Sequence, residues 1–212
     1  SGRGLGFTGG TIDKLESIEG FDVQLPQDKF IKQVNDINIA LVGQTGNLTP
    51  ADKKIYALRD VTGTTESIPL IASSIMSKKI ASGSKNLVLD IKIGDGALVK
   101  NIEDARTLAN LMVKIGNAYG IRVVCLLTNM DIPLGSNVGN ALEINEVIDI
   151  LNNKGDEQLR ELCLVLSATI LSISLDWDYD EAYKKAEQTI IDGSAYKKFI
   201  EFATAQSESD KI

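Results

Sequence analysis

Histidine is absent from the 212 residues of this sequence. It is the side chain whose ordinary pKa lies closest to neutral pH, so its absence excludes histidine as a general acid or base. Proton transfer near neutral pH would have to come from a shifted carboxylate, a lysine, a tyrosine or a phosphate of the substrate.

Cysteine is scarce as well, since the chain has only Cys125 and Cys163. Each lies inside an apolar run, VVCLL for the first and LCLVL for the second. We therefore predict two buried, reduced thiols in a cytoplasmic protein rather than a disulfide. Neither cysteine has neighbours at a spacing typical of a metal site.

Basic clusters and long apolar runs are also missing. The net charge is −7, and no block of Lys or Arg is longer than two residues, which excludes a general affinity for the nucleic-acid backbone. The uninterrupted apolar runs are only a few residues long, far short of a membrane span, and no secretory signal is present. We expect a soluble protein with neither nucleic acid nor a membrane as a partner.

Glycine, by contrast, is concentrated at the start of the chain. Residues 1–11, SGRGLGFTGGT, hold five glycines and lead into a helix-like run, IDKLESI. Such a loop can point backbone N–H groups at an anion, and a mobile tail explains the same composition. Both interpretations stay open for this segment alone. Because the chain begins without Met, we expect it to be part of a longer protein.

Hydrophobic periodicity predicts an α/β fold with a mostly parallel sheet flanked by helices. Buried-strand patterns occur at 86–94 and 121–129, with an amphipathic helix at 101–120 between them, which is the order of a parallel crossover unit. Shorter strand-like runs are predicted at 21–25 and 37–43. Further helices are predicted at 28–37, 50–60, 68–80, 142–151, 156–175 and 180–206, the last of them broken at Asp192-Gly193.

The stretch from Tyr56 to Lys79 gathers polar groups on two of these helices. Arg59 ends the first helix, and Ser74 and Lys78 stand four residues apart on the second, so their side chains project from one face. A planar guanidinium, a hydroxyl and an ammonium group can together hold a flat, oxygen-rich heterocycle. The alternative is a solvated helix surface that carries a Ser/Lys pair.

Four blocks of the sequence resemble the pyrimidine-nucleoside phosphorylases, a family that includes thymidine phosphorylase. They are SGRGLGFTGGTIDKLESI, GQTGNLTPADKKIYALRDVTGTTESIPLIASSIMSKKIA, LDIKIGDGALVK and PLGSNVGNALEINEVID, and the resemblance runs from Ser1 to about Gln206. It implies a glycosyltransferase that performs reversible phosphorolysis. Phosphate attacks the anomeric carbon of a pyrimidine nucleoside such as uridine or thymidine, and a free base and a pentose 1-phosphate result. Inorganic phosphate is then the co-substrate, and no organic cofactor is expected.

The resemblance also assigns a site for the base. Arg59, Ser74 and Lys78 match the family's base-binding motif, and Arg59 and Lys78 would be the catalytic cations that favour the departing pyrimidine anion. Phe7 and Leu98 would line the same site. Phe7 stands where the family has a histidine, and Leu98 stands where it has an aromatic residue, so we expect a slower enzyme or an altered choice of base.

Phosphate and cation ligands follow from the same comparison. Ser1 and Thr11 match phosphate-binding hydroxyls, whereas the family's second phosphate loop, Lys-His-Ser-Thr-Gly-Gly, does not occur in this sequence. A monovalent-cation site, for K⁺, would map onto the backbone around Leu134 and Asn137 and onto the carboxylate of Glu146.

The resemblance implies two domains and a homodimer. Residues 49–81 would belong to a small helical domain that carries the base-binding residues and the dimer contact. Residues 1–48 and 82–212 would form part of an α/β phosphate-binding domain. Two other functions stay open: a nucleoside-binding relative without catalysis, because Phe7 cannot transfer a proton, and a phosphoribosyltransferase of similar architecture, against which the base-binding pattern speaks.

Overall fold

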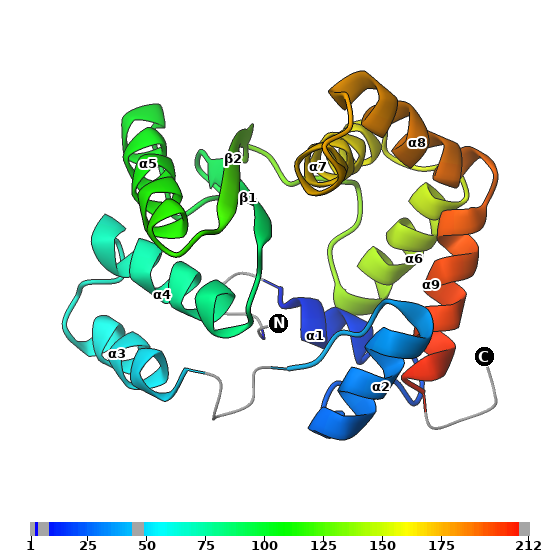
Figure 1. Ribbon diagram of the computed structural model, residues 1–212, viewed down its shortest axis with the longest axis horizontal. Coiled ribbons are helices and arrows are strands. Elements are labelled where there is room, and N and C mark those ends of the chain that lie inside the picture. The colour runs from blue at the N-terminus through cyan, green and yellow to red at the C-terminus, as the bar shows by residue number, and fades with distance from the viewer. Residues whose placement is uncertain (1–2, 4–8, 44–48, 208–212) are drawn as a thin grey trace. The chain divides into compact units, whose positions relative to one another are not determined.

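The computed structural model describes residue 3 and residues 9–43 and 49–207. These residues form helices and two strands in an order that Figure 1 shows. The elements are α1 (Thr11–Leu15), α2 (Gln27–Ile37), α3 (Pro50–Val61), α4 (Ile68–Ala81), β1 (Asn86–Ile93), α5 (Ile102–Ala118), β2 (Arg122–Asn129), α6 (Asn140–Leu151), α7 (Glu157–Leu175), α8 (Tyr179–Ile191) and α9 (Ser194–Ala205).

The chain divides into two compact units. The first contains 1–44, 135–160 and 187–212, and the second contains 45–134 and 161–186. α4 packs on α5 and shares a core with the strands, so residues 49–81 lie within the second unit. The assignment of 49–81 to a helical domain of a longer protein stays a prediction.

The second unit contains the predicted strand–helix–strand arrangement. β1 and β2 pair in parallel over their whole length, with Asn86 opposite Arg122 and Ile93 opposite Asn129. α5 connects them, and its N-terminus is capped by the Asn101 side chain, which accepts a hydrogen bond from the Asp104 N–H at 2.8 Å. The predicted α/β class and parallel pairing are therefore confirmed.

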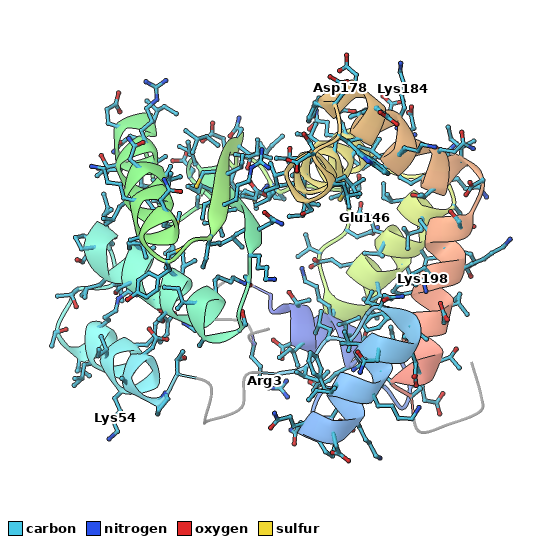
Figure 2. All side chains as sticks on the ribbon, viewed as in Figure 1. Arg3, Lys54, Glu146, Asp178, Lys184 and Lys198 are labelled. Carbon is cyan, nitrogen blue, oxygen red and sulfur yellow. The ribbon has the colours of Figure 1, made fainter. Side chains whose placement is uncertain are left out.

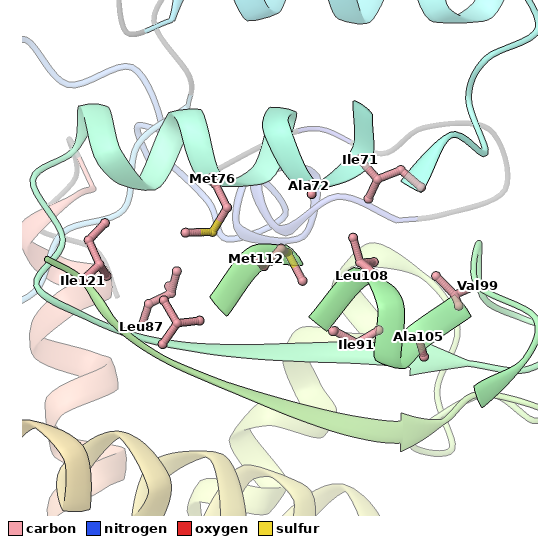
Figure 3. Packing of buried hydrophobic residues seen from close by; sticks show 11 residues of the cluster. Ile71, Ala72, Met76, Leu87, Ile91, Val99, Ala105, Leu108, Met112 and Ile121 are labelled. Carbon is pink, nitrogen blue, oxygen red and sulfur yellow. The ribbon is translucent and has the colours of Figure 1, made fainter. Parts of the chain in front are cut away.

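One apolar core holds this second unit together. Figure 3 shows α5 between α4 and the strands, with Ala72 and Met76 from α4 facing Leu108 and Met112 from α5. Ala72 has no exposed surface, and Met76 and Met112 are each 1% exposed. Packing this tight leaves no room for α4 to rotate about its axis, so it determines where the polar face of α4 points.

The first unit has its own core around α1 and α6. Phe21 and Phe202 meet edge to face, with ring centroids 5.4 Å apart and an interplanar angle of 72°. Ile12 and Leu15 of α1 belong to the same buried cluster as Ile144 of α6. Short helix α1 is thus stabilised by tertiary packing rather than by its length.

The side-chain amide of Gln206 joins three segments of this first unit. Its Nε2 donates to the carbonyl oxygens of Asp22 at 2.8 Å and Leu41 at 2.9 Å, and its Oε1 accepts from the Leu41 N–H at 2.8 Å. Gln33 Nε2 donates to the same oxygen at 3.3 Å. Gln206 is only 2% exposed, so these bonds satisfy polar groups that water does not reach.

The strands predicted at 21–25 and 37–43 are wrong. In these two segments the structure has an isolated bridge between Phe21 and Ser207, the end of α2 at Ile37, and irregular backbone elsewhere. Their backbone groups bond to Gln206, and the Gly43 N–H donates to the Val23 carbonyl at 2.8 Å. Because an inserted side-chain amide takes the place of a neighbouring strand, the alternating pattern does not produce a ladder.

Both cysteines are free, as predicted, but Cys163 is exposed and Cys125 is half-buried. The prediction of two buried thiols is therefore wrong for Cys163. The buried residues of α7 include Leu164 and Ala168, and Cys163 lies beside that stripe. Burial raises the pKa of the Cys125 thiol, so this group stays protonated at neutral pH.

Among the residues that the structure describes, one helix is long and apolar enough to cross a membrane. This helix is α7, which has 19 residues and a mean hydropathy of 1.4. Of its most apolar window, 22% is buried. The lengths of the uninterrupted apolar runs did not indicate a helix of this kind, because isolated polar residues interrupt the apolar sequence of α7. A single helix of this kind is weak evidence, since core helices of water-soluble proteins have the same length and composition.

We predict that Gln206→Ala lowers the free energy of unfolding by about 2–4 kcal/mol, because buried backbone groups of Asp22 and Leu41 lose their partners. Urea denaturation of the 212-residue chain measures the change. The matched control is Gln158→Ala on the exposed first turn of α7, which should stay within about 0.5 kcal/mol of the parent. Equal losses in both variants would contradict the role given to Gln206.

Candidate functional site

Helices α3 and α4 bring the predicted base-binding residues together. α3 begins at Pro50, whose missing N–H is tolerated at a first helical position, and α4 has Pro69 in its first turn. A short turn at 62–67 joins the two helices, so Arg59 at the end of α3 lies close in sequence to the start of α4. Both helices belong to the second unit.

Arg59 is buried, at 6% exposure, and its guanidinium fastens the turn between the helices. The Nε–H group donates to the Thr64 carbonyl at 3.4 Å, and one terminal nitrogen donates to the Thr65 carbonyl. A guanidinium has five N–H groups, so these bonds fix its plane without using all of its donors.

Lys78 is bound by Ser74 and by Asp52 of α3. Its Nζ donates to the Ser74 hydroxyl at 2.9 Å, to the Ser74 carbonyl at 2.9 Å and to Asp52 Oδ2 at 2.6 Å. The side chains of Lys78 and Asp52 are 31% and 10% exposed, and Ser74 is buried. The prediction that Ser74 and Lys78 share one face of the helix is confirmed.

The aromatic ring of Tyr56 joins the two cations. Arg59 Cζ lies 5.4 Å from its centroid, and Lys78 Nζ lies 5.9 Å from it. Both distances are within the range in which a cation is attracted to the face of a ring. Two positive charges therefore stand beside a single partly exposed aromatic surface.

A solvated helix surface does not describe this cluster, because Arg59 and Ser74 are both buried. Sequence reasoning missed two of its members, Asp52 and Tyr56. Their spacing carried the signal: Asp52, Tyr56 and Arg59 stand at i, i+4 and i+7 and therefore share one face of α3.

Leu98 lies in the loop after β1, and its side chain is 66% exposed. The end of β2 holds this loop, because the Gly96 N–H donates to the Met130 carbonyl at 2.8 Å and the Asp95 N–H donates to Asp131 Oδ1 at 3.1 Å. Gly94 has φ +132°, and a Cβ there would lie 2.2 Å from Asp131 Oδ1, so only glycine fits. The loop thus stands at the carboxyl ends of parallel strands, where ligands of α/β proteins bind.

The predicted phosphate residues are only partly described. Ser1 and Phe7 lie outside the described residues, and Thr11 is the exposed first residue of α1, in the first unit. Arg3 donates to Asp13 of α1 at 2.7 Å and to Glu16, the residue after α1, at 2.7 Å. The hydrogen bond from Arg3 lowers the pKa of the Glu16 carboxyl below its ordinary value.

Glu146 of the predicted cation site is buried, at 5% exposure, on α6 (Figure 2). Its Oε1 accepts the Ser136 N–H at 2.6 Å. Gly135 has φ +77°, and a Cβ there would lie 2.4 Å from Glu146 Oε2, so the loop closes tightly on the carboxylate. Asn137 follows in the same loop and is half-buried, as is Leu134 just before it. Among the described residues, no group of three or more His, Cys, Asp and Glu side chains gathers as a metal site.

Comparison with known proteins supports one family. A family model described as "Glycosyl transferase family, a/b domain" matches residues 1–196. Pyrimidine-nucleoside phosphorylase of Staphylococcus haemolyticus is 55% identical over 207 residues, which cover 97% of this chain and 48% of that protein. The protein of the same name from Bacillus subtilis is 54% identical over 213 residues, covering 100% of this chain and 49% of that protein. The one from Geobacillus stearothermophilus is 54% identical over 207 residues, covering 97% and 48%.

The chain thus spans about half the length of the curated relatives it matches. The family model covers most of its residues, and the described strands and helices agree with an α/β domain. The chain therefore belongs to the glycosyl transferase family that has this a/b domain.

Proposed function

We propose that this chain is part of a longer enzyme that catalyses phosphorolysis of pyrimidine nucleosides such as uridine and thymidine. The observation that carries the proposal is that Arg59 and Lys78 both stand beside the ring of Tyr56, with the Ser74 hydroxyl bonded to Lys78. The names of the relatives support the same reaction.

The cluster suits a reaction in which negative charge develops on a leaving base. As the bond to the anomeric carbon breaks, the pyrimidine takes the bonding electron pair, and Arg59 and Lys78 lower the energy of the resulting anion. Arg59 is 6% exposed, so its charge acts more strongly than it would in water, whereas the Lys78 side chain is 31% exposed.

Ser74 would orient the ring of the base. Its hydroxyl oxygen already accepts a hydrogen bond from Lys78, so the hydroxyl hydrogen remains to be donated. The partner must then be an acceptor, such as a carbonyl oxygen of the pyrimidine. Leu98, and Phe7 outside the described residues, would add apolar surface to this site.

Phosphate would be held by Ser1 and Thr11 together with groups of the longer protein. A phosphate oxygen must approach the anomeric carbon from the side opposite the base. Phosphate therefore needs binding groups other than those that hold the base. The hydroxyls of Ser1 and Thr11 would donate to phosphate oxygens. A homodimer and a cytoplasmic location complete the proposal for the longer protein.

A monovalent cation, K⁺, fits beside Glu146. A buried carboxylate needs a compensating charge or several donors, and the Ser136 N–H supplies one donor. The backbone carbonyls of Leu134 and Asn137 would complete part of the oxygen shell that such an ion prefers. Bound there, the cation would supply charge compensation and hold the loop against α6.

The proposed reaction predicts that the longer protein, given uridine or thymidine with inorganic phosphate, releases free uracil or thymine. Chromatography of the products measures the base, and omission of phosphate is the control that separates phosphorolysis from hydrolysis. Absence of base with both nucleosides would refute the proposal. If nucleoside binds by calorimetry without turnover and Phe7→His restores base release, the enzyme is one impaired at that position.

We predict that Arg59→Lys lowers kcat/KM of the longer protein by about 100-fold, because an ammonium group cannot both hold the turn carbonyls and donate to the base. The matched control removes another cation of α3, in Lys54→Ala, whose side chain is exposed and points away from the helix (Figure 2). This control should keep the parent's activity. Comparable losses in the two variants, or full activity in Arg59→Lys, would contradict the specific role given to the guanidinium.

The cation site predicts that K⁺ raises the midpoint of thermal unfolding of the longer protein at constant ionic strength. Binding to the folded state alone contributes about 1.4 kcal/mol at ten times the Kd. Glu146→Gln should abolish the K⁺-dependent shift, and replacement of K⁺ by choline is the salt control. An equal shift in the parent and in Glu146→Gln would show that K⁺ stabilises the protein at a site other than Glu146.

A further inference from the structure

The ammonium group of Lys78 has no donor to spare in the structure. A protonated lysine has three N–H donors, and Lys78 directs them to Asp52, to the Ser74 hydroxyl and to the Ser74 carbonyl. A base oxygen or a ring anion can therefore reach Lys78 only by replacing one of these three partners.

The three contacts differ in what their loss would cost. Loss of the Asp52 contact would leave a carboxylate that is only 10% exposed without its counter-charge, which is the most expensive outcome. The Ser74 carbonyl keeps another donor, because the Ser77 hydroxyl donates to it at 3.1 Å. The Ser74 carbonyl is thus the partner that a ligand replaces most easily.

We propose that Asp52 is a positioning residue for Lys78. It holds the ammonium group at the junction of α3 and α4 and beside the Ser74 hydroxyl, and it retains its contact while the base replaces the Ser74 carbonyl. This inference rests on the proposed phosphorolysis, to which it adds a residue that does not itself touch the base.

The placement of Asp52 on α3 supports this role. Asp52, Tyr56 and Arg59 share one face of the helix, so a single face supplies the anion that holds one cation, the ring between both cations, and the second cation. An ion pair that only joined α3 to α4 would not need Lys78 to bond to Ser74 as well.

The test is a double-mutant cycle in the longer protein, with Asp52→Asn and Lys78→Met made singly and together. Asp52→Asn keeps an oxygen acceptor but removes the charge. We expect it to lower kcat/KM for uridine by about 10–100-fold, mainly through kcat, because the anion of the departing base is no longer met by a fixed ammonium group. In the Lys78→Met background the same change should have little further effect, since Asp52 acts through Lys78.

Two controls separate positioning from stability. Asp52→Glu restores the carboxylate and should recover most of the activity, whereas Glu103→Gln removes an exposed carboxylate from the first turn of α5 and should change nothing. A further readout uses the parent chain without substrate: labelling of Lys78 by an amine-reactive acetylating reagent, followed by mass spectrometry, should be several-fold faster in Asp52→Asn, with Lys79 as the internal reference.

The outcomes distinguish the two proposals. If the unmodified protein releases no base, the proposed function fails and takes this inference with it. If it releases base but Asp52→Asn is as active as the parent, or loses equal activity with and without Lys78, then Asp52 has only a structural role and this inference alone is overturned. Unchanged labelling of Lys78 in Asp52→Asn would likewise overturn it.

Discussion

The packing of α4 on α5 is the constraint on which the site depends. Ala72 and Met76 face α5 with almost no exposed surface, so α4 has one possible rotation about its axis. That rotation turns Ser74 and Lys78 toward α3 rather than toward the strands. The position of Ser74 and Lys78 therefore follows from apolar contacts made by residues two positions away in the same helix.

Charge in the cluster is arranged around one aromatic ring. Two cations beside Tyr56 would repel each other in an empty pocket, and each has an oxygen partner that offsets this repulsion: Asp52 for Lys78, and the turn carbonyls for Arg59. The partners differ in kind, because Lys78 is held by an opposite charge and Arg59 by dipoles. Fixed groups of this sort need little rearrangement when a ligand acquires negative charge.

Much of the fold could be predicted because helical periodicity is strong over long segments, and the predicted bounds of α3, α4 and α7 lie within one residue or two of those observed. The prediction of strands at 21–25 and 37–43 was wrong, because the alternating pattern does not reveal that Gln206 takes the hydrogen bonds of these segments. In the site, the spacing of Ser74 and Lys78 was enough to predict that they share a helix face. Asp52 could have been predicted from its position on the same face of α3 as Arg59. Its pairing with a lysine on another helix depends on tertiary packing, which no local pattern contains.

The contacts of Gln206 also bear on the order in which the chain can fold during synthesis. They join residues 184 and 165 positions apart, so the first unit cannot close until almost the last described residue has left the ribosome. The buried cluster that α4, α5 and the strands share in the second unit lies between residues 71 and 123 and is available much earlier. Residues 9–43 are made before both of these segments and therefore wait for Gln206, and during this interval their apolar side chains are most open to a chaperone.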